Sequence, residues 1–245
     1  MIFTRDNLLI NGDSLIGLQL LQGIQSYDFM LIDPPKRNLG EGVWEQRLKE
    51  RLQLAYPLLK EDGAVAFFTN DQDYPFIRTI CNEVFQEENY VNTFLLKKEH
   101  DIHIQKGSTK KLVQPFDFLV VYRKSERFFY KEGVKRKDGI MDTNMLSYPV
   151  EDEKGLEKYG LTDIKNVKTI KKILTMFTSP TSNILDFYAK SGSTGQAILE
   201  LNYESKNSRT FTLITDNAEE ICYPRIQKQS FIFNSLFDYL IIEDK

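Results

Sequence analysis

The sequence predicts one α/β domain, built as a sheet with helices on both of its faces. Two observations predict this fold class. Short apolar runs alternate along the chain with segments whose apolar residues recur at helical spacing, which is typical of a sheet covered by helices. Some runs, such as residues 28–32, are also too apolar to have a face in water. A chain of 245 residues is long enough to bury the core of such a domain.

The expected elements follow one another in a regular order. The clearest helix is the amphipathic segment 43–59, and the clearest buried strand follows the turn that opens residues 61–70. The other strands are expected at 7–11, 28–32, 90–98, 116–124, 182–190 and 208–217. The other helices are expected at 14–24, 73–85, 166–177 and, after an opening turn, 191–202.

Residues 125–161 interrupt this alternation. They carry scattered charges and glycines without a sustained period, which indicates a short insertion within a single domain spanning residues 1–245. The segment 230–242, in contrast, is apolar, so we expect the end of the chain to pack back on the body.

Composition and charge narrow the class of protein. A hydrophobic fraction of 41%, a charged fraction of 27% and a net charge of −3 are those of a globular chain without an overall basic field. No apolar run is long enough to span a bilayer, and the first residues lack the features of a signal peptide, so we expect a cytoplasmic protein. Cys81 and Cys222 fit no metal spacing and are expected to be buried thiols. His100 and His103 are interpreted as loop residues, and no metal site is expected.

The end of the second strand carries the first candidate site, in the stretch Asp33-Pro34-Pro35-Lys36. In open α/β sheets, ligands lie outside the carboxyl ends of the strands. The two prolines fix the backbone and offer no N–H of their own, so the carbonyls of Asp33 and Pro34 are available beside the Asp33 carboxylate. Such a group of acceptors suits a ligand amine.

A second candidate site follows the strand expected at 182–190. A tight turn with Gly192 and several hydroxyls leads into a helix, which is the layout of a cofactor loop at a helix N-terminus. The stretch has neither the spacing of a phosphate-binding P-loop nor the three glycines of a dinucleotide fingerprint. From the residues alone, a structural turn and a ligand loop are equally good interpretations.

Taken together, the two motifs resemble those of DNA methyltransferases that act on amino groups. LIDPPK, followed about 150 residues later by ILDFYAKSGSTGQAILELN, resembles a catalytic Asp-Pro-Pro-Tyr that precedes a glycine-rich S-adenosylmethionine loop. This order is that of the β group of adenine-N6 methyltransferases, and the sequence is most similar to the modification subunits of type III restriction–modification systems. The resemblance covers nearly the whole chain, with TDNAEEICYPRIQK as its closing helix.

The resemblance implies a Rossmann-like sheet and a role for each site residue. Asp33 and the Pro34 carbonyl would accept hydrogen bonds from the amine of a flipped adenine, on the platform completed by Pro35 and Lys36. S-adenosylmethionine would be held by Asp13 at its adenine, Asp216 at its ribose and Lys165 at its methionine end. The alternative interpretation is that Asp13 and Asp216 are ordinary cap or loop acids and that Lys165 is a solvated base. The loop itself would contribute Asp186, Tyr188, Ala189, Lys190, Ser191 and Gly192.

The sequence departs from the family pattern at two demanding positions. Lys36 stands where the family has an aromatic ring that stacks on the flipped base, and such stacking is worth about 1–3 kcal/mol. Lys190 stands where the family has a glycine that allows the cofactor to approach, and its cation is unfavourable beside a sulfonium. We therefore expect weak S-adenosylmethionine binding and impaired methyl transfer.

Three hypotheses about function follow. The chain is an adenine-N6 DNA methyltransferase with an altered site, an inactive methyltransferase-like subunit that binds DNA or a partner chain, or an unrelated α/β enzyme with chance motifs. The expected partners are double-stranded DNA and a second copy, another methyltransferase chain or a restriction subunit. Residues 125–161 would stand in place of a target-recognition region. The rings of Phe128, Phe129 and Tyr130 would either pack under this insertion or stack on bases.

A basic stretch is the expected DNA-binding surface. Residues 123–137 carry seven Lys or Arg against Glu126 and Glu132. Together with Lys97, Lys98 and the lysines at 106, 110 and 111, this stretch is expected to form one positive face beside Asp33, although such a run is also typical of a solvated surface.

Overall fold

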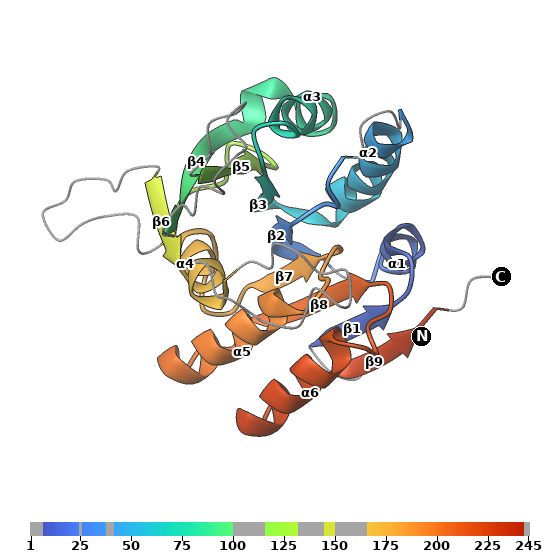
Figure 1. The fold of residues 1–245 in the computed structure, drawn as a ribbon, viewed down its shortest axis with the longest axis vertical. Helices are drawn as coiled ribbons and strands as arrows, with labels where there is room; N and C mark the ends of the chain where they lie inside the picture. Colours follow the sequence, from blue (N-terminus) through green and yellow to red (C-terminus); the bar gives the residue numbers. More distant parts are fainter. Residues whose placement is uncertain are drawn as a thin grey trace, which may run out of the picture.

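The computed structural model describes residues 7–24, 26–37, 42–99, 116–131, 145–149 and 166–242. The strands in these residues form one nine-stranded sheet in the order β6-β4-β5-β3-β2-β7-β8-β1-β9 (Figure 1). β5 is antiparallel to both of its neighbours, and the other paired strands within the described residues are parallel. The strands are β1 (Leu8–Asn11), β2 (Tyr27–Ile32), β3 (Leu59–Thr69), β4 (Tyr90–Glu99), β5 (Phe116–Arg123), β6 (Met145–Pro149), β7 (Asn183–Asp186), β8 (Thr210–Thr215) and β9 (Asp238–Ile241).

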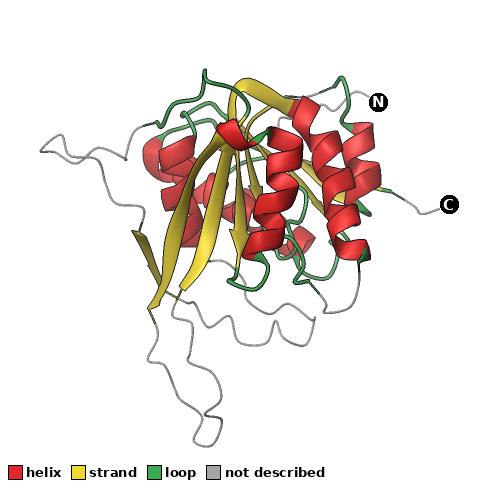
Figure 2. Cartoon of the chain, turned by 90° about the horizontal axis from the view of Figure 1, so that it is seen from above, coloured by secondary structure: helices red, strands yellow, loops and turns green. Residues whose placement is uncertain are grey.

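Helices cover both faces of this sheet, as the sequence predicts (Figures 1 and 2). One layer contains α1, α2 and α3, which contact one another in that order, and the other contains α4, α5 and α6. The α-helices are α1 (Ser14–Leu20), α2 (Val43–Ala55), α3 (Tyr74–Phe85), α4 (Val167–Phe177), α5 (Ser193–Ser205) and α6 (Cys222–Ile232), and two short 3₁₀ helices span Tyr56–Leu58 and Glu87–Asn89.

Strand β2 shows why the sheet needs both layers. Phe29 and Leu31 point into the core under α4 and α5, whereas Met30 and Ile32 point into the core under α1 to α3. All four side chains are almost completely buried. Because successive side chains of a strand point to opposite faces, an unbroken apolar run can be buried only between two layers.

Several predicted boundaries move by a few residues. The helix predicted over 43–59 ends at Ala55, because Pro57 has no N–H to continue the helical hydrogen bonds and the chain turns through a short 3₁₀ helix. Strand β3 then begins at Leu59, earlier than predicted. The strand predicted over 182–190 ends at Asp186, which places Tyr188 and Lys190 in the loop before α5.

The insertion contains a strand that the sequence pattern did not predict, since β6 pairs with β4 and forms an edge of the sheet. At the start of the insertion, Phe128 and Tyr130 pack on Phe177 of α4, with ring centroids 6.3 and 5.5 Å away. This favours packing over base stacking for these two rings. The Phe129 side chain is exposed and lies under the ammonium of Lys131.

The end of the chain packs back on the body, as predicted. Strand β9 pairs in parallel with β1 and becomes an edge of the sheet. Cys81 and Cys222 are both buried and free, as predicted, and burial raises the pKa of each thiol, that of Cys222 to about 12. Within the described residues, the helices are all too short or too polar to cross a membrane.

The basic stretch does not lie where the sequence analysis placed it. β5 runs antiparallel to β3. Arg123, the last residue of β5, therefore pairs with Ala64 in the first half of β3 and lies far from the carboxyl end of β3, which leads to Asn70. Lys124 donates hydrogen bonds to the carbonyls of Tyr56 and Leu59, so it fastens the turn before β3. The described part of the stretch, residues 123–131, therefore begins at the amino ends of the parallel strands, whereas Asp33 lies at their carboxyl ends. Residues 132–137 lie outside the described residues.

Candidate active site

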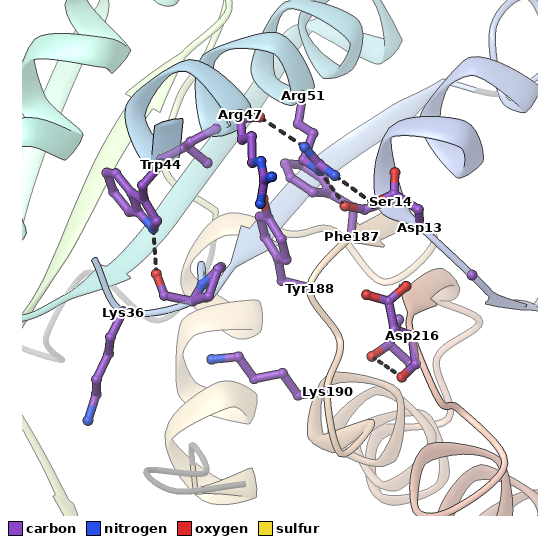
Figure 3. A pocket seen from close by; sticks show the side chains of 14 residues that line it. Asp13, Ser14, Lys36, Trp44, Arg47, Arg51, Phe187, Tyr188, Lys190 and Asp216 are labelled. Carbon is purple, nitrogen blue, oxygen red and sulfur yellow. Dashed lines mark hydrogen bonds and ion pairs between the residues drawn. The ribbon is translucent and has the colours of Figure 1, made fainter. Parts of the chain in front are cut away.

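The carboxyl ends of β1, β2 and β8 and the loop after β7 surround one cavity of about 430 Å³ (Figure 3). Parallel strands end at the same edge of a sheet, which brings together residues from distant parts of the chain. The side of the cavity that faces away from the sheet is formed by α2. The lining residues are Gly12, Asp13, Ser14, Pro35, Lys36, Trp44, Arg47, Leu48, Arg51, Phe187, Tyr188, Lys190, Thr215 and Asp216.

The stretch after β2 is held in place by the neighbouring helices. Trp44 of α2 donates a hydrogen bond from Nε1 to the Pro35 carbonyl oxygen at 2.8 Å. Arg37 is ion-paired with Glu45 at 2.6 Å, and its backbone N–H donates to Asp73 at the start of α3. These contacts, added to the fixed φ of two prolines, make the stretch from Asp33 to Lys36 a rigid platform, of which Pro35 and Lys36 line the cavity.

Lys190 contacts the candidate catalytic carboxylate directly. Its Nζ lies 2.7 Å from Asp33 Oδ2, and the two side chains are 32% and 20% exposed. Lys190 also has a φ of +48°, the left-handed conformation that favours glycine and costs other residues about 1 kcal/mol. The loop therefore keeps a glycine-like backbone at this position and uses it to direct an ammonium at Asp33.

Gly192 shows that this loop has little room to vary. Its φ is +78°, and a β-carbon at this position would lie 2.9 Å from the Sγ of Cys222. On the same loop, Ser191 and Ser193 accept hydrogen bonds from Arg225 of α6, and the Ala189 N–H donates to the Ile214 carbonyl. The loop is thus fixed between β8 and α6.

Asp186, the last residue of β7, is a buried acid beneath the loop. It accepts hydrogen bonds from Thr194 Oγ1 at 2.6 Å and from the Tyr188 N–H at 3.0 Å. Burial raises its pKa to about 7, although these two hydrogen bonds act in the opposite direction. Asp186 therefore holds the turn together, and it lines a small second cavity with Asp33 and Lys190 instead of the main one.

Asp13 and Asp216 both line the main cavity, at the ends of β1 and β8. Asp13 caps α1 by accepting from the Leu15 N–H at 2.7 Å, and it is ion-paired with Arg51 at 2.6 Å. Its two oxygens are therefore already engaged within the protein. Asp216 is exposed at the mouth of the cavity.

Lys36 lies on the other side of the Asp33 platform and is exposed. It borders a small third cavity that also contains the buried acids Asp73 and Asp117. In Figure 3 its side chain points away from the Lys190 side chain. The two lysines thus flank Asp33 from separate directions.

Several residues that the sequence analysis singled out fall outside the described residues. Lys165, His100 and His103 are among them, so the role of Lys165 at the methionine end stays a prediction. Among the residues that the structure describes, His, Cys, Asp and Glu side chains form no group of three suited to a metal ion.

The sequence analysis missed the face of α2 that forms the outer wall. Trp44, Arg47 and Arg51 recur at spacings of three and four residues, so they lie on one side of the helix. This spacing is visible in the sequence and indicates that the three side chains share one face of the helix. What the sequence did not indicate was that this face would also border a cavity.

The sequence is similar to those of known proteins. A family model described as DNA methylase matches residues 27–228. The probable type III restriction–modification enzyme HindVI Mod subunit of Haemophilus influenzae is 26% identical over 147 residues, which cover 55% of this chain and 20% of that protein. The type III restriction–modification enzyme EcoP15I Mod subunit of Escherichia coli is 22% identical over 157 residues, which cover 61% of this chain and 23% of that protein. The chain thus spans less than a third of the length of these curated relatives.

Solved structures share the fold. The M1.HpyAVI–SAM complex aligns with a TM-score of 0.66 at 20% identity and covers 91% of this chain and 98% of its own. The cytosine-N4-specific PvuII DNA methyltransferase aligns with a TM-score of 0.65 at 14% identity and covers 98% of this chain and 99% of its own. The predicted fold class is therefore confirmed.

Proposed function

Because the chain belongs to the DNA methylase family, we propose that it binds duplex DNA over the carboxyl edge of its sheet, while Lys190 and Lys36 suppress methyl transfer to adenine N6. The proposal extends to a second methyltransferase chain or a restriction subunit as a possible partner. It also includes residues 125–161 as a short substitute for a target-recognition region. The family membership and the ion pair of Asp33 with Lys190, which lines the main cavity, support it.

The contact between Lys190 and Asp33 is the observation that carries this proposal. The Asp33 carboxylate is the group that would accept the hydrogen bond of a target amine, and the Lys190 ammonium already donates to it at 2.7 Å. Both donors would bond to a charged carboxylate, but the ammonium adds the attraction of an opposite charge, which a neutral amine lacks. The target amine is therefore the weaker competitor for Asp33.

S-adenosylmethionine fits only part of the site. Its nucleoside fits the main cavity, where Tyr188 and Phe187 provide an aromatic wall and Asp216 provides an acceptor for ribose hydroxyls. Its methylated sulfur, which must approach Asp33 for transfer, would meet the Lys190 ammonium instead. Two positive charges repel each other strongly in a partly buried site. The residues present thus do not fit the sulfonium end.

The unaltered chain is expected to bind S-adenosylmethionine weakly or undetectably, and Lys190→Gly is expected to bind it in the micromolar range. Glycine removes the ammonium and adopts the left-handed φ of this position without strain. Isothermal titration calorimetry measures both affinities. Lys206→Gly is the matched control, because Lys206 also has a positive φ, of +52°, and is exposed at the end of α5. Micromolar affinity in the unaltered chain would contradict the proposed suppression.

DNA binding is expected to depend on lysines at the carboxyl edge. Lys97 is exposed near the end of β4, where it pairs with Phe116 at the beginning of β5, and Lys98 follows it. In a plot of the logarithm of the binding constant against the logarithm of the salt concentration, each phosphate contact makes the slope more negative by about one unit. Lys97→Ala with Lys98→Ala should therefore flatten the slope by about two units for duplex DNA, as measured by fluorescence anisotropy.

Arg127→Ala with Lys131→Ala is the control, because it removes the same number of charges from the described part of the basic stretch, which begins at the opposite edge. An equal effect of both double variants would show that DNA is not bound at the proposed edge. Transfer of labelled methyl groups to a duplex by the unaltered chain would contradict the suppression itself.

A further inference from the structure

We propose that Arg51 broadens the specificity of the main cavity, so that the cavity binds purine nucleosides with a 6-oxo group as well as those with a 6-amino group. The inference rests on the proposed function in one respect, since it takes the cavity as the nucleoside site of a methylase fold. It goes beyond that function by naming the class of ligand and the side chain that sets it. Its basis is the ion pair between Arg51 and Asp13.

Hydrogen bonds fix the guanidinium of Arg51 between α2 and the end of β1. Arg51 donates from Nη2 to Asp13 Oδ2 at 2.6 Å and from Nε to Ser14 Oγ at 2.7 Å. Its Nη1 donates to the Arg47 carbonyl at 3.2 Å. The Arg51 side chain is only 12% exposed, whereas that of Asp13 is 36% exposed. The guanidinium is thus held in one position, directly beside the carboxylate.

The ion pair lies where the polar edge of a bound base would be. Arg51 and Asp13 line the cavity together with the aromatic residues Phe187 and Tyr188. Figure 3 shows Arg51 and Asp13 grouped with Ser14 beside Phe187. Aromatic side chains pack against the face of a base, so the hydrogen-bonding edge of the base is directed to the side. In this cavity that edge would meet the guanidinium and the carboxylate.

The ion pair offers both acceptors and donors to such an edge. Asp13 accepts one hydrogen bond at each carboxylate oxygen, from Arg51 and from the Leu15 N–H at 2.7 Å, and each oxygen can accept a second. The Nη1 and Nη2 groups of Arg51 each carry a second N–H beyond the one used in these bonds. The edge of adenine needs an acceptor for its amine and a donor for N1, and the edge of a 6-oxopurine needs the reverse. Both edges therefore find partners at the pair.

Removal of Arg51 would leave a selective site. The donors would be lost, and Asp13 would remain as a carboxylate without its ion-pair partner. A carboxylate attracts the amine of adenosine through a charge-assisted hydrogen bond and repels the carbonyl oxygen of inosine. A polar group that meets a ligand atom of the wrong kind stays unpaired, and this discriminates strongly between ligands. Arg51 therefore decides whether the cavity distinguishes the two nucleosides.

The experiment titrates the whole chain calorimetrically with adenosine and inosine, which are both uncharged. We expect the unaltered chain to bind the two nucleosides with affinities within about threefold of each other. Arg51→Met should bind adenosine about tenfold or more tightly than inosine. Methionine supplies an apolar side chain in place of the Arg51 stem. The hydrogen bond from Gln22 Nε2 to the Leu54 carbonyl, at 2.9 Å, still joins α1 to α2 in this variant.

Two control variants assign the effect to the pair. Lys49→Met also removes an ion pair of α2, that with Glu83 at 2.6 Å, but Lys49 does not line the cavity, so the two affinities should stay similar. Asp13→Asn added to Arg51→Met keeps an acceptor that caps α1 and removes the carboxylate. Because an amide offers both a donor and an acceptor, this double variant should lose the preference for adenosine.

Three results would overturn the inference. The first is a preference of more than about threefold for either nucleoside in the unaltered chain, and the second is similar affinities in Arg51→Met. The third is binding of neither nucleoside by the unaltered chain, because the cavity would then not be a nucleoside site. The suppression of methyl transfer by Lys190 is tested separately, since it fails on methyl transfer by the unaltered chain.

Discussion

The double variant Lys36→Tyr with Lys190→Gly is expected to transfer methyl groups from S-adenosylmethionine to adenine in duplex DNA, while the unaltered chain transfers none. Removal of Lys190 takes away the ammonium that lies 2.7 Å from Asp33 Oδ2 and competes with the target amine for it. Tyrosine at the exposed position 36 supplies a ring on which the flipped base can stack. We expect a gain of about 100-fold or more over background, since each change restores about 1–3 kcal/mol.

The gain should be strongly non-additive. Lys36→Tyr alone leaves Asp33 bound to Lys190, and Lys190→Gly alone leaves the flipped base without a stacking partner. Either defect by itself prevents a productive complex, so each single change should give little activity. Incorporation of labelled methyl groups into a duplex, followed by nucleoside analysis, measures the rate and identifies the methylated base.

Two controls separate repair of the site from unspecific effects. Asp33→Ala in the repaired chain should abolish the gain, because the amine loses its acceptor. Lys36→Tyr combined with Lys206→Gly changes the same residue types but leaves the Lys190–Asp33 contact in place, so it should stay inactive. If the repaired chain binds both S-adenosylmethionine and DNA without any transfer, the suppression does not lie in these two lysines.

The stability of the fold is expected to fall as the pH rises from about 4 to about 8, through the ionisation of Asp186. Burial raises the pKa of this carboxyl from 3.8 to about 7 in the folded chain. The folded state therefore binds a proton that the unfolded state has already released over this interval. The resulting stability is fully present below the unfolded pKa and is lost through the folded pKa, by up to about 4 kcal/mol.

Urea unfolding of the unaltered chain and of Asp186→Asn at the two pH values measures this contribution. Asparagine keeps an acceptor for the Tyr188 N–H and a polar partner for Thr194, but it cannot ionise. The variant should therefore lose much less stability than the unaltered chain as the pH rises. Asp71→Asn, a similar change at an exposed turn, should retain the full dependence. Equal pH dependence in the unaltered chain and Asp186→Asn would refute this role of Asp186.

The local elements could be predicted because their causes are local. The apolar run of β2, the helical spacing in α2 and the two prolines after Ile32 each leave a direct mark on the sequence. The same holds for the turn at Gly192, whose positive φ and contact with Cys222 require a residue without a β-carbon. Boundaries were less accurate, and β6 was missed, because pairing with β4 stabilises a strand whose own pattern is weak.

The position predicted for residues 123–131 of the basic stretch was wrong for a related reason. The sequence predicts a strand over 116–124 but does not indicate its direction in the sheet. Because β5 pairs antiparallel with β3 and β4, Arg123 lies at the end of the sheet opposite to Asp33. Lys124 donates a hydrogen bond to the backbone before β3. Strand direction depends on distant partners, so it follows from the assembled sheet.

The sequence by itself determined the α/β architecture, the two motifs at strand ends and the two lysines that depart from the family pattern. Only the tertiary structure decided where those lysines lie and what they contact. It brought Lys190 within 2.7 Å of Asp33 across 157 positions of the chain, paired Arg51 with Asp13, and directed Arg47 over the cavity. Such contacts depend on the order and direction of strands that are distant in sequence, and a local pattern of residues contains neither.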